Sequence, residues 1–164
     1  MKITVALFLL SLAVINTSFA QLEDEKRKVE KSIELLFSGM SKGDSSLVHS
    51  AFAKQVTMAT IGKDKLGNSF IHYESGISDF LIAVGTAHAE SWNEPIWELK
   101  ISIDGNFAQA WANYAFYLGK RFSHCGVDAF HLVKEDGAWK IFHLSDTRQK
   151  EGCKIPEEVS NRFK

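Results

Sequence analysis

A carboxylate and an imidazole near the C-terminus are the side chains best suited to acid–base chemistry. Asp128 and His143 fall on two expected strands, 124–134 and 138–147, which the turn signal Asp136-Gly137 joins. A two-residue turn there makes the two side chains diagonal neighbours on one face. The carboxylate would then orient the ring and raise its basicity. Alternatively the two residues merely satisfy each other or water, and a one-residue change in register would move His143 to the opposite face.

A second polar pair, His124 and Arg148, is expected near the other end of these strands. The guanidinium offers a fork of donors that suits an anion or a carboxylate, so the pair predicts a clamp at the mouth of a cavity. The alternative is a local ion pair of Arg148 with Asp146, or with Asp128 across the sheet.

Aromatic residues recur on the expected strands and could line a pocket for a flat organic molecule. They are Tyr73, Trp97, Trp111, Tyr114, Tyr117 and Trp139. Asn113 shares the face of Trp111 and Tyr117 and could orient a ligand. Alternation allows only about half of these side chains to face inward, and core packing is the competing explanation. The predicted binding set is Tyr73, Trp97, Trp111, Asn113, Tyr117, His124, Asp128, His143 and Arg148.

The sequence contains no pattern for a metal or a cofactor. The histidines are scattered, no H-E-x-x-H is present, and no glycine loop of the phosphate-binding kind occurs. Cys125 and Cys153 lie in the part expected to be exported, where oxidising conditions favour a disulfide over two free thiols. A Cys125 nucleophile is disfavoured, because adjacent His124 points to the opposite face and an oxidised cysteine cannot attack.

The N-terminus has the pattern of a secretory signal peptide. Lys2 precedes an apolar run over 3–15, and Ser18 and Ala20 fit a cleavage site that leaves Gln21 as the new N-terminus. The run is shorter than a membrane span needs, although an uncleaved anchor is the alternative. We therefore expect a signal peptide over 1–20, one domain over 21–164, and a periplasmic or secreted product. The net charge of −1 argues against a nucleic-acid partner, and no later apolar run could span a membrane.

The elements expected to position these residues form an α+β domain. Helical periodicity precedes and follows the corner Gly43-Asp44, and a third helix is expected over 75–84. Strands are expected over 55–61, 69–73, 96–103, 107–118, 124–134 and 138–147. Short turns between consecutive strands predict a curved antiparallel sheet wrapped around three N-terminal helices, forming a cone with a pocket.

Two blocks of sequence resemble a known superfamily. The segment Phe37 to Asp44 resembles the helix–Gly-Asp–helix opening of the nuclear transport factor 2-like superfamily, whose members share a cystatin-like α+β cone. The C-terminal block, from Tyr114 to Arg148, is similar to a branch of exported bacterial proteins labelled putative lumazine-binding. The resemblance implies a pocket at the open end of the cone. It leaves the function open, because the superfamily includes isomerases, cyclases, dehydratases and non-catalytic binding modules.

Three functions are compatible with these features. The first is a non-catalytic protein that binds a small aromatic or amphipathic molecule. The second is an isomerase, cyclase or dehydratase that uses Asp128 or His143 as base, with Tyr117 or Asn113 polarising a carbonyl. The third, compatible with both, is an interaction module, since the resemblance also implies a homodimer formed through the open sheet face.

Overall fold

The computed structural model describes residues 2–74 and 76–164, with side chains described from residue 20 onward. The chain begins with helix α1 (Lys2–Lys42), and α2 (Ser45–Ala51) follows after a tight corner. Gly43 forms this corner with a φ of 67°, a left-handed conformation that glycine adopts at little cost. Asp44 then caps α2 by accepting a hydrogen bond from Leu47 N at 2.9 Å. The side chains of the predicted signal peptide lie almost entirely outside the described residues.

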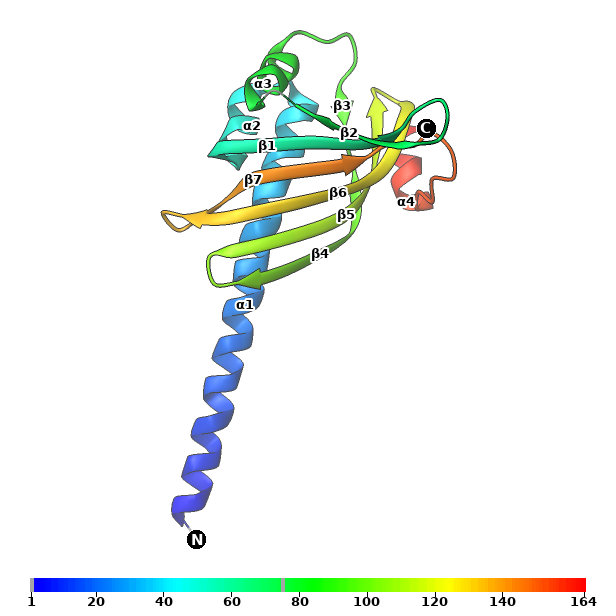
Figure 1. Cartoon of the computed structure of the whole chain (residues 1–164). Helices are drawn as coiled ribbons and strands as arrows, with labels where there is room; N and C mark the ends of the chain where they lie inside the picture. The colour runs from blue at the N-terminus through cyan, green and yellow to red at the C-terminus, as the bar shows by residue number, and fades with distance from the viewer. Residues whose placement is uncertain (1, 75) are drawn as a thin grey trace.

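The remaining elements complete one curved sheet, whose inner side the first three helices cover, and a C-terminal segment that contains the fourth (Figure 1). They are β1 (Phe52–Lys63), β2 (Ser69–Tyr73), α3 (Ile77–Gly85), β3 (Trp92–Asn93), β4 (Ile96–Asp104), β5 (Phe107–Leu118), β6 (Arg121–Glu135), β7 (Ala138–Thr147), α4 (Glu157–Ser160) and a final 3-10 turn, Asn161–Phe163. The strand order is β2-β1-β7-β6-β5-β3, with β4 also paired to β5. This confirms the α+β cone predicted from the sequence.

The sheet is mixed rather than wholly antiparallel, which corrects the expected strand pairing. β1 runs parallel to β7, while the other paired strands are antiparallel. Short hairpin turns impose antiparallel pairing on β4 to β7. β1 joins the far edge of that meander from a distant part of the chain, so no turn constrains its direction. Only the tertiary arrangement decides it.

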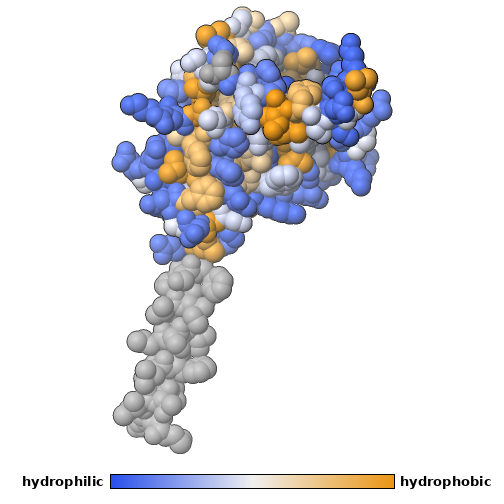
Figure 2. All heavy atoms as spheres, viewed as in Figure 1, coloured by the Kyte–Doolittle hydropathy of each residue, from blue (hydrophilic) through white to orange (hydrophobic). Residues whose placement is uncertain are grey.

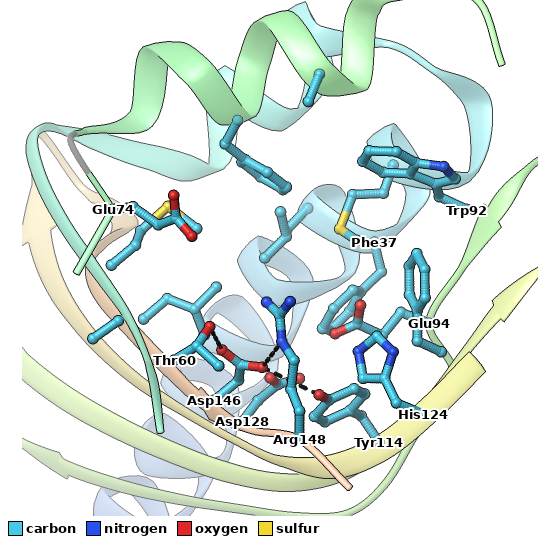
Figure 3. Close-up of a pocket in the computed structure, with 18 of the residues that line it drawn as sticks. Phe37, Thr60, Glu74, Trp92, Glu94, Tyr114, His124, Asp128, Asp146 and Arg148 are labelled. Carbon is cyan, nitrogen blue, oxygen red and sulfur yellow. Dashed lines mark hydrogen bonds and ion pairs between the residues drawn. The ribbon is translucent and has the colours of Figure 1, made fainter. Parts of the chain in front are cut away.

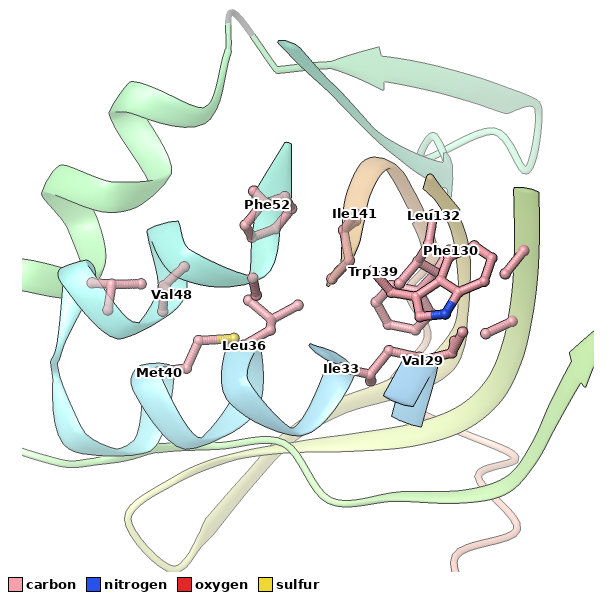
Figure 4. Packing of buried hydrophobic residues seen from close by; sticks show 14 residues of the cluster. Val29, Ile33, Leu36, Met40, Val48, Phe52, Phe130, Leu132, Trp139 and Ile141 are labelled. Atoms are coloured by element: carbon pink, nitrogen blue, oxygen red, sulfur yellow. The ribbon is translucent and has the colours of Figure 1, made fainter. Parts of the chain in front are cut away.

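The core lies between α1 and the concave face of the sheet (Figure 4). Val29, Ile33 and Leu36 of α1 are fully buried against sheet residues that include Phe130 and Ile141. Burying each of these large side chains contributes about 1.5–3 kcal/mol. On β5 the core-facing residues are mainly small alanines, which lets α1 approach the sheet closely.

A polar cluster fastens the start of the buried part of α1 to the sheet. Glu25 accepts hydrogen bonds from Lys134 Nζ at 2.6 Å and from Trp139 Nε1 at 2.8 Å. About two turns further on, Ser32 Oγ donates to Trp139 O at 2.6 Å. Hydrogen bonds from Lys134, Lys28 and Trp139 lower the pKa of Glu25 to about 2. The helix is therefore held by charge as well as by apolar packing.

A second, smaller core lies on the outer face of the sheet, where the C-terminal segment packs. The predicted disulfide is confirmed: Cys125 on β6 is bonded to Cys153, with their Cα atoms 6.0 Å apart. Beyond it, Phe163 stacks on Tyr117 with ring centroids 4.0 Å apart. Trp97 packs against the same cluster. The disulfide thus closes the C-terminal segment over one end of the outer face.

The surface is mainly hydrophilic, with separate apolar patches (Figure 2). Phe70 and Ile71 on the β1–β2 hairpin, and Phe107 and Trp111 on the outer face of β5, are exposed. Within the described residues, no helix combines the length and the apolar character needed to cross a membrane.

Candidate functional site

A cavity of about 390 Å³ lies between the helices and the concave face of the sheet (Figure 3). Its wall is largely apolar and comes from α1, α3 and the strands. This wall includes Leu36, Phe37, Phe80, Trp92, Phe116 and Leu144. Polar side chains gather on the side formed by β5, β6, β7 and Glu94. The volume and the mixed lining are typical of a site for a small organic molecule.

Asp146 is the centre of the polar side. Thr60 Oγ1 donates a hydrogen bond to Asp146 Oδ1 at 2.6 Å, and Arg148 Nε donates to Oδ2 at 2.6 Å. The Tyr114 hydroxyl lies 3.2 Å from Asp146 Oδ2 and 2.9 Å from Thr147 O, within donating distance of both. Both oxygens of this carboxylate therefore have hydrogen-bond partners. The Arg148–Asp146 ion pair is one of the alternatives that the sequence left open.

Burial and the charge of Asp146 together affect the protonation of Tyr114 and Arg148. Burial, and then the negative charge of Asp146, raises the pKa of Tyr114, so its hydroxyl remains a donor at physiological pH. Burial disfavours the charge on Arg148, but the hydrogen bond and charge of Asp146 outweigh it and raise the pKa of Arg148. Both side chains can thus donate hydrogen bonds near neutral pH.

Two further acids, Glu94 and Asp128, form a coupled pair beside this network. Asp128 is only 2 % exposed, and burial followed by the charges of Glu94 and Asp146 raises its pKa well above the usual value. Burial and the charge of Asp146 raise the pKa of Glu94 to about 7, against the opposing effects of its hydrogen bond with Asp128 and of Arg148. Both shifts favour the protonated forms, so the two acids can share a proton.

One atom of this pair lacks a donor. Among the described residues, Asp128 Oδ2 is the buried side-chain polar atom without a hydrogen-bond partner. A proton carried by Glu94 can satisfy it, and so can an N–H or O–H group of a bound molecule. Glu94 keeps part of its surface accessible and lines the cavity, so an occupant can reach both acids.

His124 also faces the cavity but does not act as a cation there. Burial, and then the positive charge of Arg148, lowers its pKa to about 4. Its ring packs against Phe116 at a centroid distance of 5.1 Å, and its Nδ1 lies 3.0 Å from Ser123 Oγ. At neutral pH this imidazole is uncharged, so of the predicted clamp only Arg148 carries positive charge.

The backbone of β6 and β7 explains how these side chains converge. The alternation of β6 turns His124, Gly126 and Asp128 to the concave face. At Gly126 the end of β7 crosses so closely that an added Cβ would overlap the Thr147 carbonyl. The absence of a side chain there lets β7 bring Asp146 and Arg148 over the cavity, which is a packing role for glycine.

Three of the predicted binding residues line the cavity: His124, Asp128 and Arg148. Tyr73 does not line it and is 69 % exposed on the edge strand β2. Trp111, Asn113 and Tyr117 share one face of β5, as predicted, but it is the outer face. Trp111 is exposed there, Asn113 Nδ2 donates to Glu98 Oε2, and Tyr117 packs under the C-terminal segment.

Two irregularities in the strands overturn the other expected positions. At β4, a bulge at Glu98, whose φ is 54°, turns Trp97 to the outer face opposite Asn113, away from the face of Leu99. At β7, the register shifts by one residue at Phe142, so His131 rather than Phe130 lies opposite His143.

The second shift separates the predicted acid–base pair. His143 points to the outer face, where its Nδ1 lies 2.7 Å from Thr57 Oγ1, while Asp128 faces the cavity and lies opposite Asp146. The predicted Asp128–His143 neighbourhood is therefore wrong, because the two-residue turn is present but a bulge beyond it changes the register.

Sequence reasoning missed Glu94 and did not assign Asp146, Thr60 or Trp92 to the cavity. Tyr114 was among the aromatic candidates for the pocket but was not included in the predicted binding set. A cross-strand argument could have found Tyr114, since it lies on the β5 face adjacent to Asp128. Nothing in the local sequence marks Glu94, which precedes Pro95 between β3 and β4. Its position depends on how the chain crosses from α3 to β4.

The cone of helices inside a curved sheet, with a pocket at its open end, defines a protein of the nuclear transport factor 2-like class. It is similar to an NTF2-like protein with a cystatin-like fold from Novosphingobium aromaticivorans, at 9 % identity and a TM-score of 0.65. That match covers 90 % of this chain and 93 % of the other. It is also similar to a structure described as a putative scytalone dehydratase from the same organism, at 13 % identity and a TM-score of 0.65, covering 80 % and 89 %.

A third similar structure is an NTF2-like protein of unknown function from Shewanella baltica, at 19 % identity and a TM-score of 0.56, covering 78 % of this chain and 96 % of the other. No curated protein matches the chain. The family described as putative lumazine-binding matches residues 24–144. The chain belongs to this family, which confirms the branch that its C-terminal block resembles.

Proposed function

We propose that this protein is a non-catalytic binding protein that holds one small organic molecule in the cavity. The observation that carries the proposal is the cavity itself, with about 390 Å³ of space, apolar walls and a polar side of donors and acceptors. The family description and the fold support small-molecule binding. The polar groups would orient the molecule, and the apolar wall would supply most of the affinity.

The test is to recover the occupant and then to block its site. The protein is purified without unfolding from the cells that make it, and native mass spectrometry compares its mass with that of the denatured chain. Ala83→Trp on α3 would fill the cavity, whereas Ile82→Trp on the same helix is a matched control, because Ile82 is 68 % exposed. We expect a bound small molecule that Ala83→Trp excludes and Ile82→Trp retains. Equal occupancy in both variants would contradict the proposal.

A second candidate is an enzyme of the isomerase, cyclase or dehydratase kind. It is favoured by Glu94, whose pKa of about 7 suits a general base at neutral pH, beside protonated Asp128 and Tyr114 as hydrogen-bond donors to a developing oxyanion. The acid–base pair of this candidate is thus Glu94 and Asp128 instead of Asp128 and His143. Incubating the recovered molecule with wild-type protein and with Glu94→Gln tests it. Conversion by the wild type alone would favour the enzyme, and an unchanged molecule favours the binder.

We also propose that the protein is exported and forms a homodimer. The disulfide suits an oxidising compartment, and the first 20 residues have the pattern of a cleaved signal. The exposed Phe107 and Trp111 on the outer face of β5 support pairing through the sheet. A mature N-terminus at Gln21 and a dimer mass by light scattering are expected. A monomer at high concentration would contradict the dimer.

A further inference from the structure

We propose that the cavity's occupant is an organic cation, a molecule with a flat apolar body and one amine or amidine group that donates hydrogen bonds to Glu94 and Asp128. This inference rests on the proposed binding function and adds the charge class of the ligand. It combines the charge balance of the cavity, the buried oxygen without a donor, and the aromatic walls.

The charge balance of the lining is strongly acidic. Carboxyl groups line the cavity from α3, β6, β7 and the segments that follow β2 and β3. Arg148 is the cationic side chain among the described lining residues. These carboxyl groups belong to Glu74, Asp79, Glu94, Asp128 and Asp146. Arg148 is already neutralised by Asp146 at 2.6 Å, and His124 is uncharged at neutral pH. An occupant can therefore supply the positive charge that would balance ionised Glu94 and Asp128.

The site for that positive charge is the Glu94–Asp128 pair. Asp128 Oδ2 is buried and has no donor, and Asp128 lines the cavity. In the empty protein a proton carried by Glu94 can fill this position. An ammonium or amidinium N–H supplies the same hydrogen bond and also balances the negative charge when the proton leaves. A neutral donor would supply the hydrogen bond but no positive charge. Once the proton left, a buried carboxylate of the pair would have no counter-charge, which is costly.

The walls suit the rest of such a molecule. Phe37, Trp92 and Phe116 contribute aromatic side chains to the cavity lining. Figure 3 shows Trp92 on the same side of the cavity as Glu94. Aromatic faces attract cations as well as flat apolar bodies. The competing occupant is an anion held by Arg148, whose Nε is engaged by Asp146 and whose remaining nitrogens point into the cavity. Comparing the affinities of cationic and anionic probes separates these two charge classes.

The test uses three probes with one common body: 2-naphthamidine, 2-naphthamide and 2-naphthoate. Calorimetry at pH 8.5 is expected to rank the amidine at least tenfold tighter than the amide, with the naphthoate weakest. The affinity for the amidine should fall about 30-fold between pH 8.5 and pH 5.5, because a proton competes for Glu94 with a pKa of about 7. The affinity for the neutral amide should change little over the same range.

The pH profile has to be assigned to Glu94 among the groups that face it. These are Asp128 and His124 on β6, Tyr114 on β5, Asp146 and Arg148 at the end of β7, and Glu74 and Asp79 across the cavity. Glu94→Gln should remove both the preference for the amidine and its pH dependence. Glu98→Gln, on the outer face of β4, is the matched control and should retain both. The wild-type profile alone remains informative if a variant does not fold.

The relative affinities of the three naphthyl probes decide between the possible charge classes of the occupant. Naphthoate binding more tightly than the amidine would overturn it and assign the selectivity to Arg148. Equal binding of amide and amidine would overturn the cation while leaving a small-molecule site in place. Absence of binding by all three probes would also overturn it, whereas the molecule recovered from purified protein judges the proposed function separately.

Discussion

Replacing Gly126 by alanine should damage both the fold and the cavity, since β7 crosses β6 at this glycine. The added Cβ would overlap the Thr147 carbonyl group and lie 2.7 Å from its carbon and 3.0 Å from Thr147 Oγ1. Either β7 moves away from β6 or the strand distorts. Overpacking of this kind costs about 1–3 kcal/mol in a well-packed region.

Two hydrogen bonds add to that cost. Thr147 O accepts from the Tyr114 hydroxyl at 2.9 Å, and Thr147 Oγ1 accepts from Val127 N at 3.1 Å. A displacement large enough to relieve the overlap breaks both, and each contributes about 1 kcal/mol. The expected loss of stability is therefore about 3–5 kcal/mol. The same displacement moves Asp146 and Arg148 away from the cavity, so binding of any occupant should weaken as well.

Urea denaturation followed by circular dichroism measures the first effect, and titration with the naphthyl probe that binds wild-type protein measures the second. Glu135→Ala is the control, because it places alanine at an exposed position on the same strand. It should change stability by less than about 0.5 kcal/mol. A Gly126→Ala variant with wild-type stability and affinity would refute the role we assign to this crossing.

Three further predictions concern the anchors and acids. Replacing Cys125 and Cys153 together by alanine should cost about 3–4 kcal/mol of stability, because their disulfide joins residues 28 positions apart. The loss should appear as a lower melting temperature. An unchanged melting temperature would show that the C-terminal segment needs no covalent anchor. Glu25→Gln should cost about 1–2 kcal/mol of stability at pH 7. Because Glu25 has a lowered pKa of about 2, the difference from wild type should shrink as pH falls from 4.5 towards 2. A difference in urea midpoint that stays constant with pH would contradict the ion pair. Glu94→Gln should stabilise the empty protein by about 1–3 kcal/mol above pH 7, because the raised pKa of Glu94 makes its ionisation costly in the folded state. This gain in stability should vanish below pH 4.5, where Glu94 is protonated in both states. A gain confined to acid pH would refute the assignment.

Local signals in the sequence predicted the bounds of three strands and placed most of the other elements within a few residues. The strands 69–73, 107–118 and 138–147 agree with the structure, because alternation and turn residues act over a few positions. Asp136 and Gly137 both have positive φ, as the predicted hairpin requires. The disulfide followed from the export pattern and the presence of two cysteines. The very short β3 lacks any comparable signal.

The direction in which β5 faces could not be predicted from its own residues. One face carries Phe107, Trp111 and Tyr117, and the other carries alanines with Tyr114 and Phe116. The bulkier face is the outer one, because α1 packs closely on the alanines while the C-terminal segment covers Tyr117. The predicted aromatic lining from β5 was placed on the wrong face for this reason.

By itself, the sequence determined the fold class, the hairpin turn at Asp136-Gly137 and the helix corner at Gly43. It also placed Asp128, His124 and Arg148 at the cavity. Tertiary structure decided the rest: the bulges at Glu98 and Phe142, the parallel β1–β7 pair, and the meeting of Glu94 with Asp128. A bulge changes the face of a side chain by the insertion of one residue, which no local pattern records. Contacts between residues distant in the chain depend on how the whole sheet closes around α1.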